Sequence, residues 1–308
     1  MSATVPHKRV LCVGVAVLDF IFQVDAFPTR PVKYRARDAA ISTGGNSANA
    51  ALAIARAGGR PVLCGRIGQD EVAHLIRARL GAEGIDTSLL RAFEGHRSSY
   101  SSILIDAEGE RQIVNFRDAS LSFDAGWVAA DAPADLGAIL GDTRWPQGAA
   151  AAMALARERG VPGIVDAESP VAEAMEALPL ASHVAFGDVA ALEFTGETDV
   201  ERAGLAAHER LPGLITVTAG ARGTLLIEAD ATPRWFEAPR VAAIDTLGAG
   251  DVWHGHYAMA LAQGAAVPAA IERANVAAAL KCTRAGGASG APTASEIATF
   301  MTNGEDRQ

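Results

Sequence analysis

The sequence predicts an α/β fold: a doubly wound, mostly parallel sheet with helices on both faces, and a small antiparallel β-sheet that forms a lid. Three observations predict this class. Strand-like and helix-like segments alternate along most of the 308 residues. Apolar residues make up 49% of the chain, which is enough for a large core. Two stretches, about 18–40 and 97–118, instead alternate apolar with polar residues, as half-exposed strands do.

The alternating segments can be assigned in order. RVLCVGVAV (9–17) is expected to be a buried strand, and NSANAALAIARAGG (46–59) a helix that glycine ends. The next strand and helix are expected at 60–68 and 70–84. Further strands are expected at 137–142, 161–168, 183–188 and 214–220, and a further helix at 149–160. Strands that alternate with helices in this way favour a parallel sheet covered on both faces.

The lid is expected to come from two separate insertions. FIFQVDAFP (20–28) and the residues up to about 40 form the first insertion. SYSSILID (99–106) and RQIVNF (111–116), which are joined by a turn, form the second. We expect both insertions to stand over the carboxyl-terminal edge of the main sheet, within a single domain that spans residues 1–308.

Composition and charge exclude several classes of function. The formal net charge is -9 and the pI is about 5.3, so we expect neither a nucleic acid nor a membrane as a partner. No apolar stretch reaches the roughly 18 residues of a membrane span, and MSATVPHKRV does not resemble a secretory signal. Cys12, Cys64 and Cys282 are too widely spaced for a zinc or disulfide pattern. A cytoplasmic protein is expected.

The stretch DTLGAGD (245–251) places an acid directly after a glycine-containing turn and directly before an apolar helical run. Gly248 and Gly250 allow the backbone to approach a ligand closely, and the N-terminus of a helix attracts negative charge. Together with Ala249 they would form an anion hole for a phosphoryl group, and Asp251 would take the proton from an attacking hydroxyl. The alternative is that Asp251 only caps the helix.

Three other stretches carry polar residues at strand ends or helix starts. GGNSANAA (44–51) is a glycine pair before a helix, with Asn46 and Asn49 one turn apart. Both amides can face a polyhydroxy ligand, although Asn46 can also cap the helix. Asp19 is an acid in an apolar context, where a sugar hydroxyl would be a fitting partner. VTAGARG (217–223) is a turn of a kind found at nucleotide sites, but also at ordinary strand ends.

With these motifs, the chain resembles the ribokinase-like (PfkB) carbohydrate kinases over nearly its whole length. GGNSANAALAIARAGG and DTLGAGDVWHGHYAMAL match two family signatures in order, and the second is highly specific. The resemblance implies a doubly wound α/β domain with a β-sheet lid. It also implies transfer of the γ-phosphate of ATP to a hydroxymethyl group of a sugar or nucleoside, with Mg²⁺ as a cofactor. Whether a monovalent cation takes part is left open.

The resemblance also implies roles for single residues. Asp251 matches the catalytic base, and residues 248–250 match the anion hole. The positions that bind sugar hydroxyls are matched by Asp19, Gly45 and Asn49. The nucleotide-binding turn is matched by Thr218, Gly220 and Gly223, and a position beside the adenine by Asn275.

One departure from the family concerns the metal. An Asn-x-x-Glu motif that organises magnesium in many members is replaced here by GDVA (187–190). Gly187 stands at the Asn position and Ala190 at the Glu position. Asp188 is a candidate to replace part of that function through a water molecule, and the direct metal ligands stay unassigned.

The remaining cations suggest the substrate. Lys33, Asn115 and Arg144, with Arg117 beside Asn115 in the chain, are expected to converge on one spot and hold a terminal anion. Taken alone, each lid charge is better explained by solvation. The combination resembles the sulfofructose kinase branch of the family, which implies 6-deoxy-6-sulfofructose as the substrate and its 1-phosphate as the product.

Several alternatives stay open at this point. A fructokinase-like or ketohexokinase-like enzyme, or a kinase of a phosphorylated ketose, would use the same motifs. A catalytically silent sugar- or nucleotide-binding regulator would keep the fold without the reaction. A dinucleotide oxidoreductase is disfavoured, because VGVAVLD after the first strand lacks the required glycine pattern. The apolar run FIFQV in the lid suggests a homodimer formed through the lid.

Overall fold

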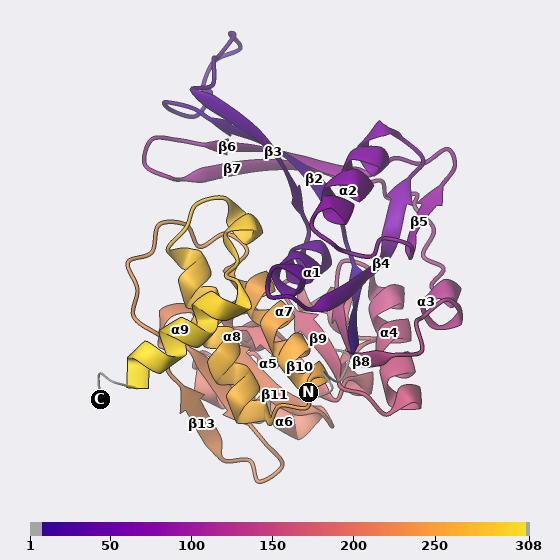
Figure 1. The fold of residues 1–308 in the computed structure, drawn as a ribbon, viewed down its shortest axis with the longest axis vertical. Helices are drawn as coiled ribbons and strands as arrows, with labels where there is room; N and C mark the ends of the chain where they lie inside the picture. The colour runs from indigo at the N-terminus through magenta and orange to yellow at the C-terminus, as the bar shows by residue number, and fades with distance from the viewer. Residues whose placement is uncertain (1–7, 306–308) are drawn as a thin grey trace, which may run out of the picture.

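A nine-stranded sheet forms the centre of the computed structural model, which describes residues 8–305 (Figure 1). The strand order is β13-β12-β11-β10-β9-β8-β1-β4-β5. All neighbours from β11 to β5 are parallel, and β12 and β13 add an antiparallel hairpin at one edge. The strands are β1 (Arg9–Gly14), β4 (Arg60–Gly68), β5 (Leu90–Phe93), β8 (Leu136–Asp142), β9 (Gly163–Ala167), β10 (His183–Gly187), β11 (Leu214–Thr218), β12 (Thr224–Ile227) and β13 (Pro233–Phe236).

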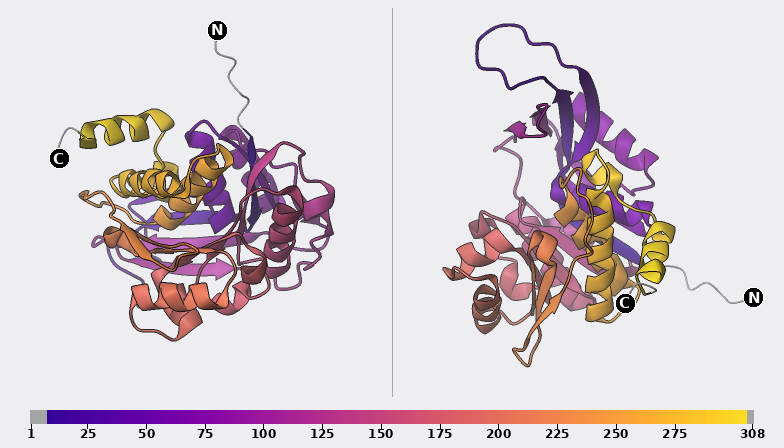
Figure 2. Two further views of the ribbon diagram at one scale, coloured as in Figure 1. Left: turned by 90° about the horizontal axis from the view of Figure 1, so that it is seen from below. Right: turned by 90° about the vertical axis from the view of Figure 1, so that its left-hand side faces the viewer.

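The central strands of this sheet are buried on both faces, because successive side chains of a strand point to opposite sides. In β1, Val10 and Cys12 belong to one buried apolar cluster, whereas Leu11 and Val13 belong to the other. Figure 2 (left) shows the two helical layers on either side of the sheet. The predicted α/β fold class, with a mostly parallel sheet between helices, is therefore confirmed.

The helices divide between the two faces. The first face is covered by α1 (Asn46–Arg56), α2 (Glu71–Ala82), α7 (Ala249–Ala262) and α8 (Val267–Cys282), and α9 (Ala294–Glu305) packs against α8. The second face is covered by α3 (Gly126–Ala130), α4 (Pro146–Arg159), α5 (Asp188–Thr195) and α6 (Val200–Arg210). Short 3₁₀ turns lie at η1 (Val171–Ala174), η2 (Leu178–Leu180), η3 (Gly220–Arg222) and η4 (Gly287–Gly290).

A second sheet of four strands, seen at the top of Figure 1, forms the lid. Its order is β3-β2-β6-β7, with β2 (Val17–Gln23), β3 (Asp38–Gly44), β6 (Ser99–Ile105) and β7 (Arg111–Phe116). Both predicted insertions contribute to it, and its outer pairs are antiparallel as expected. The central pair, β2 and β6, is parallel. The reason is that the chain between these strands crosses over through α1, β4, α2 and β5, and a crossover returns a strand in the same direction.

The first predicted strand, 9–17, is too long. Strand β1 ends at Gly14, because the N–H of Val15 donates to the side-chain Oδ2 of Asp142 (2.9 Å) and not to a backbone carbonyl of a neighbouring strand. A Cβ atom at residue 14 would lie 2.0 Å from the same oxygen, so glycine is required there. The chain then turns, and the lid strand β2 begins at Val17 instead of within 20–28.

Two expectations about the cellular setting have a structural counterpart. Among residues 8–305, no helix combines the length and hydrophobicity that a membrane span needs. The three cysteines are free thiols. Most of MSATVPHKRV, on which the expectation of a cytoplasmic protein partly rests, lies outside the described residues.

Candidate active site

A cavity of about 870 Å³ lies between the inner face of the lid and the N-termini of α1 and α7. Alternate residues of the lid strands face it, among them Asp19 of β2 and Ser101 of β6. The turn 244–248 and the loop 285–288 close another side. The cavity therefore collects the three motifs that are far apart in the sequence: Asp19, the glycine pair before α1, and the DTLGAGD turn.

The N-terminus of α7 has the geometry that an anion hole requires. Gly248 precedes the helix with a φ of 73°, in the left-handed region that favours glycine, and the helix begins at Ala249. The N–H of Ala249 donates to the carbonyl of Thr246 (3.2 Å) and closes the turn. The next amides lie in the first helical turn, where backbone N–H groups lack intrahelical acceptors. They are available to a bound anion at the positive end of the helix.

Asp251 lies inside the first turn of α7 and does not cap it. The cap position is Gly248, and no side chain caps this helix. The Asp251 carboxylate accepts a hydrogen bond from Nδ2 of Asn49 (2.7 Å) and is only 9% exposed. Burial, together with the nearby carboxylates of Glu168 and Asp142, raises the pKa of Asp251 to about 7, against the lowering effect of the hydrogen bond from Asn49. A carboxylate with this pKa is suited to general-base chemistry near neutral pH.

Four residues predicted to bind the sugar line the same cavity: Asp19, Gly45, Asn46 and Asn49. Gly45 is the residue before α1 and has a φ of 95°; a Cβ there would lie 2.5 Å from the carbonyl oxygen of Val15. Asn46 does not cap α1, since its Nδ2 donates to Asp166 Oδ2 (3.3 Å). The two asparagines therefore each hold a different carboxylate.

Asp19 faces the cavity from the lid. Burial raises the pKa of its carboxyl group, and a hydrogen bond from Ser101 opposes this rise. A Cβ at Gly44 would lie 2.0 Å from Asp19 Oδ2, so the glycine next to α1 leaves room for the acid. Asn115 of β7 continues the same row, because Asp19, Ser101 and Asn115 are paired across β2, β6 and β7. Its Nδ2 donates to Ser101 Oγ (3.1 Å).

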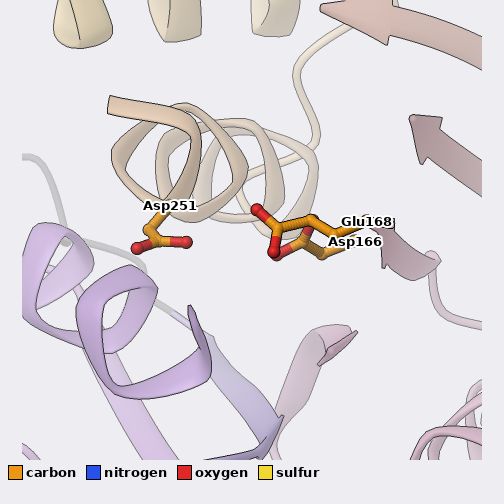
Figure 3. Close-up of side chains that lie close together, drawn as sticks. All are labelled: Asp166, Glu168 and Asp251. Carbon is orange, nitrogen blue, oxygen red and sulfur yellow. The ribbon is translucent and has the colours of Figure 1, made fainter. Parts of the chain in front are cut away.

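Two carboxylates that sequence reasoning did not single out lie next to Asp251. Asp166, the fourth residue of β9, and Glu168, just after its end, each bring an oxygen atom to within 4.8 Å of the other and of Asp251 (Figure 3). Burial raises the pKa of Asp166, and the charges of Glu168 and Asp251 add to this rise. The pattern of VPGIVDAE (161–168) by itself predicts only a strand. Two acids spaced by one residue at the carboxyl end of a buried parallel strand are a signal that could have indicated them.

A third carboxylate outside the predicted set, Asp142, lies close enough to Asp251 to affect its pKa. It lies at the end of β8 and is 1% exposed. Its oxygens accept from the backbone N–H groups of Val15 (2.9 Å), Ser47 (3.0 Å) and Arg144 (2.9 Å). Asp142 thus connects the end of β1, the first turn of α1 and the segment after β8.

Within the single chain, Lys33, Asn115 and Arg144 do not line one cavity, so their convergence on an anion is not supported here and stays a prediction. Lys33 lies on the exposed β2–β3 connection and lines neither this cavity nor the one described next. Arg144 and Arg117 instead line a second cavity of about 370 Å³, which also contains Arg66. The sequence spacing does not determine the course of a long loop, so the position of Lys33 relative to Arg144 could not be predicted.

Arg66, on β4, is the cation that the sequence reasoning missed. Its guanidinium lies over the rings of Phe123 (5.1 Å) and Trp145 (5.0 Å) and donates to the carbonyl of Ser122 (2.9 Å). Burial lowers the pKa of Arg66 to about 10, and the nearby charge of Arg117 contributes. Arg144 also pairs with Glu168 (3.2 Å) and therefore joins this second cavity to the carboxylate cluster.

The residues predicted to contact the nucleotide do not line the large cavity. Thr218 ends β11, and its hydroxyl donates to the carbonyl of Phe186 (3.3 Å). Gly220 is the first residue of η3 and Gly223 follows its end, and a Cβ at Gly223 would lie 2.0 Å from the carbonyl oxygen of Phe236. Their contact with a nucleotide stays a prediction.

Asn275 is buried in α8 with its hydrogen bonds made inside the protein. Its Oδ1 accepts from Thr224 (2.7 Å) and Trp253 (2.8 Å), and its Nδ2 donates to the carbonyl of Phe236 (2.9 Å). It therefore ties α7, α8 and the edge hairpin together. The predicted place beside the adenine stays a prediction.

Asp188, the candidate for an indirect metal contact, lies exposed at the start of α5. Its carboxylate accepts from the N–H of Val189 (2.8 Å), and it does not line the large cavity. Gly187 and Ala190 occupy this helix start as the sequence indicated. Among the described residues, the acids that cluster with Asp251 are instead Asp166 and Glu168.

Comparison with known proteins agrees with this geometry. The family described as pfkB family carbohydrate kinase matches residues 7–294. The chain belongs to this family. The ribokinase of Haemophilus influenzae is 25% identical over 304 residues, which span 96% of this chain and 99% of that protein. The ATP-dependent ribose-1-phosphate kinase of Halopiger xanaduensis is 27% identical over 301 residues, 96% of this chain and 98% of that protein.

Solved structures extend the likeness. The crystal structure of a candidate ribokinase from Agrobacterium tumefaciens superposes with a TM-score of 0.89 and 38% sequence identity, covering 98% of this chain and 99% of the other. As a pfkB family carbohydrate kinase, the protein is a sugar kinase, and the predicted enzyme class is confirmed. The comparisons show the family, but they do not show the sulfofructose kinase branch.

Proposed function

We propose that the protein is an ATP-dependent kinase that phosphorylates a primary hydroxyl of an anionic ketose. The first candidate substrate is 6-deoxy-6-sulfofructose, and the product is then its 1-phosphate. One observation carries the proposal: the Asp251 carboxylate, with a pKa raised to about 7, lies in the first turn of α7 and borders a cavity that Asp19 and Asn49 also line. A base and a site for a phosphoryl anion thus lie within one helical turn.

In the proposed reaction, the sugar lies under the lid with hydroxyl groups on Asp19 and Asn49. Asp251 takes the proton of the primary hydroxyl as its oxygen attacks the γ-phosphorus. The new O–P bond forms while the bond from phosphorus to the β-phosphate oxygen breaks, and ADP leaves. Negative charge on the moving phosphoryl group is met by the backbone N–H groups at the start of α7.

Asp166 and Glu168 are the proposed protein ligands of Mg²⁺. Carboxylate oxygens are the donors that Mg²⁺ prefers. Asp166 Oδ1 is a buried oxygen that forms no hydrogen bond with any described residue, although Nδ1 of His254 lies 3.4 Å away, and such an oxygen could be a ligand of a cation. When bound, Mg²⁺ would neutralise charge on the ATP phosphates. These two acids would replace the acid that Ala190 removes from the family motif.

The anionic part of the substrate is proposed to bind in the second cavity. Arg66, Arg117 and Arg144 line it. Arg66 is partly desolvated beside the charge of Arg117, an arrangement that an anion would stabilise. The name of the Halopiger xanaduensis relative, a kinase of ribose 1-phosphate, shows that a relative acts on an anionic sugar.

The test is a substrate panel. ADP release would be followed with ATP, Mg²⁺ and each of sulfofructose, fructose 6-phosphate, fructose and ribose. We expect the highest kcat/KM for an anionic ketose. The highest kcat/KM for neutral fructose would favour a fructokinase-like enzyme, and turnover of none of the sugars would favour the silent regulator.

We also propose that two copies associate through the outer face of the lid. Residues that alternate with the cavity-lining ones point to this face, and Ile41, Tyr100 and Val114 are 39%, 37% and 70% exposed. An exposed apolar sheet face of this kind commonly marks a protein interface. Light scattering should give twice the monomer mass for the wild type and the monomer mass for Val114→Asp; a monomeric wild type would contradict the proposal.

A further inference from the structure

Asp245, the first residue of the DTLGAGD stretch, connects the two backbone segments that border the phosphate end of the cavity. Its Oδ1 accepts from the N–H of Leu247 (2.9 Å), within the turn that leads to α7. Its Oδ2 accepts from the N–H groups of Gly286 (3.1 Å) and Gly287 (2.9 Å) in the facing loop. One carboxylate therefore fixes the distance between the turn and the loop.

A buried cation holds Asp245 from the core side. Lys281 is on the last turn of α8, and its side chain is 0% exposed. Its Nζ donates to the backbone carbonyl of Asp245 (2.6 Å) and lies 3.4 Å from Oδ2 of the same residue. The backbone N–H groups of Ile244 and Asp245 both donate to the carbonyl of Cys282 (2.7 and 3.1 Å). The end of α8 and the start of the turn are thus joined by three hydrogen bonds.

The position of this charge needs an explanation. A buried ammonium group is costly to desolvate, and an apolar side chain of the same length would fill the space without that cost. Lys281 does not line the large cavity, so it cannot touch a substrate there. The side-chain contact through which Lys281 can affect the reaction is the one with Asp245.

The same carboxylate is also held from the lid. Arg111 of β7 lines the cavity and forms an ion pair with Asp245 Oδ1. Lys281 approaches from the protein core, and its side chain is fully covered, whereas that of Arg111 is 27% exposed. One cation belongs to the fixed part of the molecule and the other to the lid.

We infer that Lys281 is a positioning residue for phosphoryl transfer: through Asp245 it holds the turn 245–248 in the conformation from which the amides at the mouth of α7 point at the phosphoryl group. This inference rests on the proposed function. Gly248 is the point of transmission, since its left-handed conformation sets the start of α7 and a Cβ there would lie 3.2 Å from the N of Ala288. A shift of about 1 Å in such a group can lower the rate roughly 100-fold.

The first test compares two methionine variants at the end of α8. Lys281→Met removes the charge and keeps the length of the side chain. Arg284→Met is the matched control, because Arg284 pairs with Glu296 of α9 and makes no contact with Asp245. We expect Lys281→Met to lower kcat about 100-fold, with the KM for the sugar unchanged within about twofold, and Arg284→Met to leave both unchanged. A kcat within twofold of wild type for Lys281→Met, or an equal loss in Arg284→Met, would overturn the inference.

The second test reads the turn directly. Hydrogen–deuterium exchange of peptides covering 245–251 and 285–288 should become faster in Lys281→Met and stay unchanged in Arg284→Met. Because no sugar is needed, this measurement separates the two proposals. If no sugar is phosphorylated but the exchange changes as expected, the proposed function fails and the role of Lys281 in holding the turn stands. If a ketose is phosphorylated but the exchange is unchanged, only the inference fails.

A milder variant covers the case in which Lys281→Met does not fold. Lys281→Gln keeps an N–H donor for the carbonyl of Asp245 and removes only the charge. We expect it to lower kcat about tenfold, because a hydrogen bond from a charged donor contributes more than one from a neutral donor. Wild-type turnover and wild-type exchange in Lys281→Gln would show that the charge has no positioning role.

Discussion

At the proposed phosphate end of the cleft, one contiguous stretch of seven residues supplies both the proposed anion hole and the proposed base, and the buried pair of Lys281 and Asp245 supports it from the core. At the far end, Arg66, Arg117 and Arg144 come from β4, the segment after β7 and the segment after β8. In the first region, the side chains of Asp245 and Lys281 form hydrogen bonds with backbone N–H and C=O groups and fix the course of the backbone. The second is held by side chains that stack or pair with their neighbours. In the proposed function, the chemistry thus depends on fixed backbone groups, and the choice of substrate depends on side chains.

The largest expected effect is at the phosphate end. Asp251→Asn should lower kcat by about 10³-fold or more, because the amide cannot accept the hydroxyl proton. Binding of ADP should stay within a few-fold of wild type. Glu71→Gln is the matched control, since Glu71 is an exposed acid in the first turn of another helix. Steady-state ADP release measures both. Turnover near the wild-type value in Asp251→Asn would remove this residue from the mechanism.

A smaller and selective effect is expected at the far end. Arg144→Ala should lower kcat/KM for an anionic ketose roughly 10- to 100-fold, as expected for the loss of a charge-assisted hydrogen bond. For neutral fructose the same variant should change kcat/KM much less. Arg202→Ala, which removes an exposed arginine on α6, serves as the control. Equal losses for both sugars would mean that Arg144 positions the site instead of selecting the anion.

The carboxylate cluster joins the two ends and should respond to the metal. Glu168→Gln should raise the Mg²⁺ concentration for half-maximal activity about tenfold, because one proposed ligand is lost. The KM for the sugar should change less. A titration of activity with MgCl₂ at saturating ATP measures this change. An unchanged metal requirement in Glu168→Gln would show that Glu168 is not a metal ligand and would favour Asp188 instead.

The smallest effect concerns pH. Asp251 acts as a base only when it is deprotonated, so kcat/KM should rise with pH through about 7, the value to which burial raises its pKa. The hydrogen bond from Asn49 stabilises the carboxylate and lowers this pKa. Asn49→Ala should therefore move the acidic limb of the profile to higher pH. A limb that stays near pH 4 in the wild type would show that Asp251 is not the titrating base.

The difference between the two ends also explains what the sequence could predict. The stretch 245–251 is contiguous. Its glycines indicate a tight turn before a helix and its last acid indicates a base, so both the local structure and the chemistry could be predicted. Asp19 and Asn49 could be placed because each lies at the end or start of a recognisable element. The alternative that Asp251 caps α7 is wrong, because the cap position is Gly248. Glycine adopts the φ of 73° at this position without strain.

The rest depended on contacts between distant segments. Arg66 and Arg144 line the same cavity because β4 and β8 both lie next to β1 in the sheet. Local sequence patterns do not determine this strand order. Asp166 and Glu168 lie in and just after β9, and the local pattern predicts this strand but not a carboxylate cluster. Lys281 lies in the apolar run VAAALKC of α8, and this pattern predicts an exposed lysine next to buried apolar residues. The structure shows it to be fully covered.

The parallel pairing of β2 with β6 has a consequence for the order in which the chain acquires its structure. The two strands are separated by β3, α1, β4, α2 and β5, so their pairing closes a long loop. The entropy of closing such a loop is recovered only after the intervening units have formed. We expect the lid to be completed late in folding, and a nascent chain that ends before residue 99 to carry β2 with one unpaired edge. The cover of the active site would then be the last part to form, after the strands beneath it.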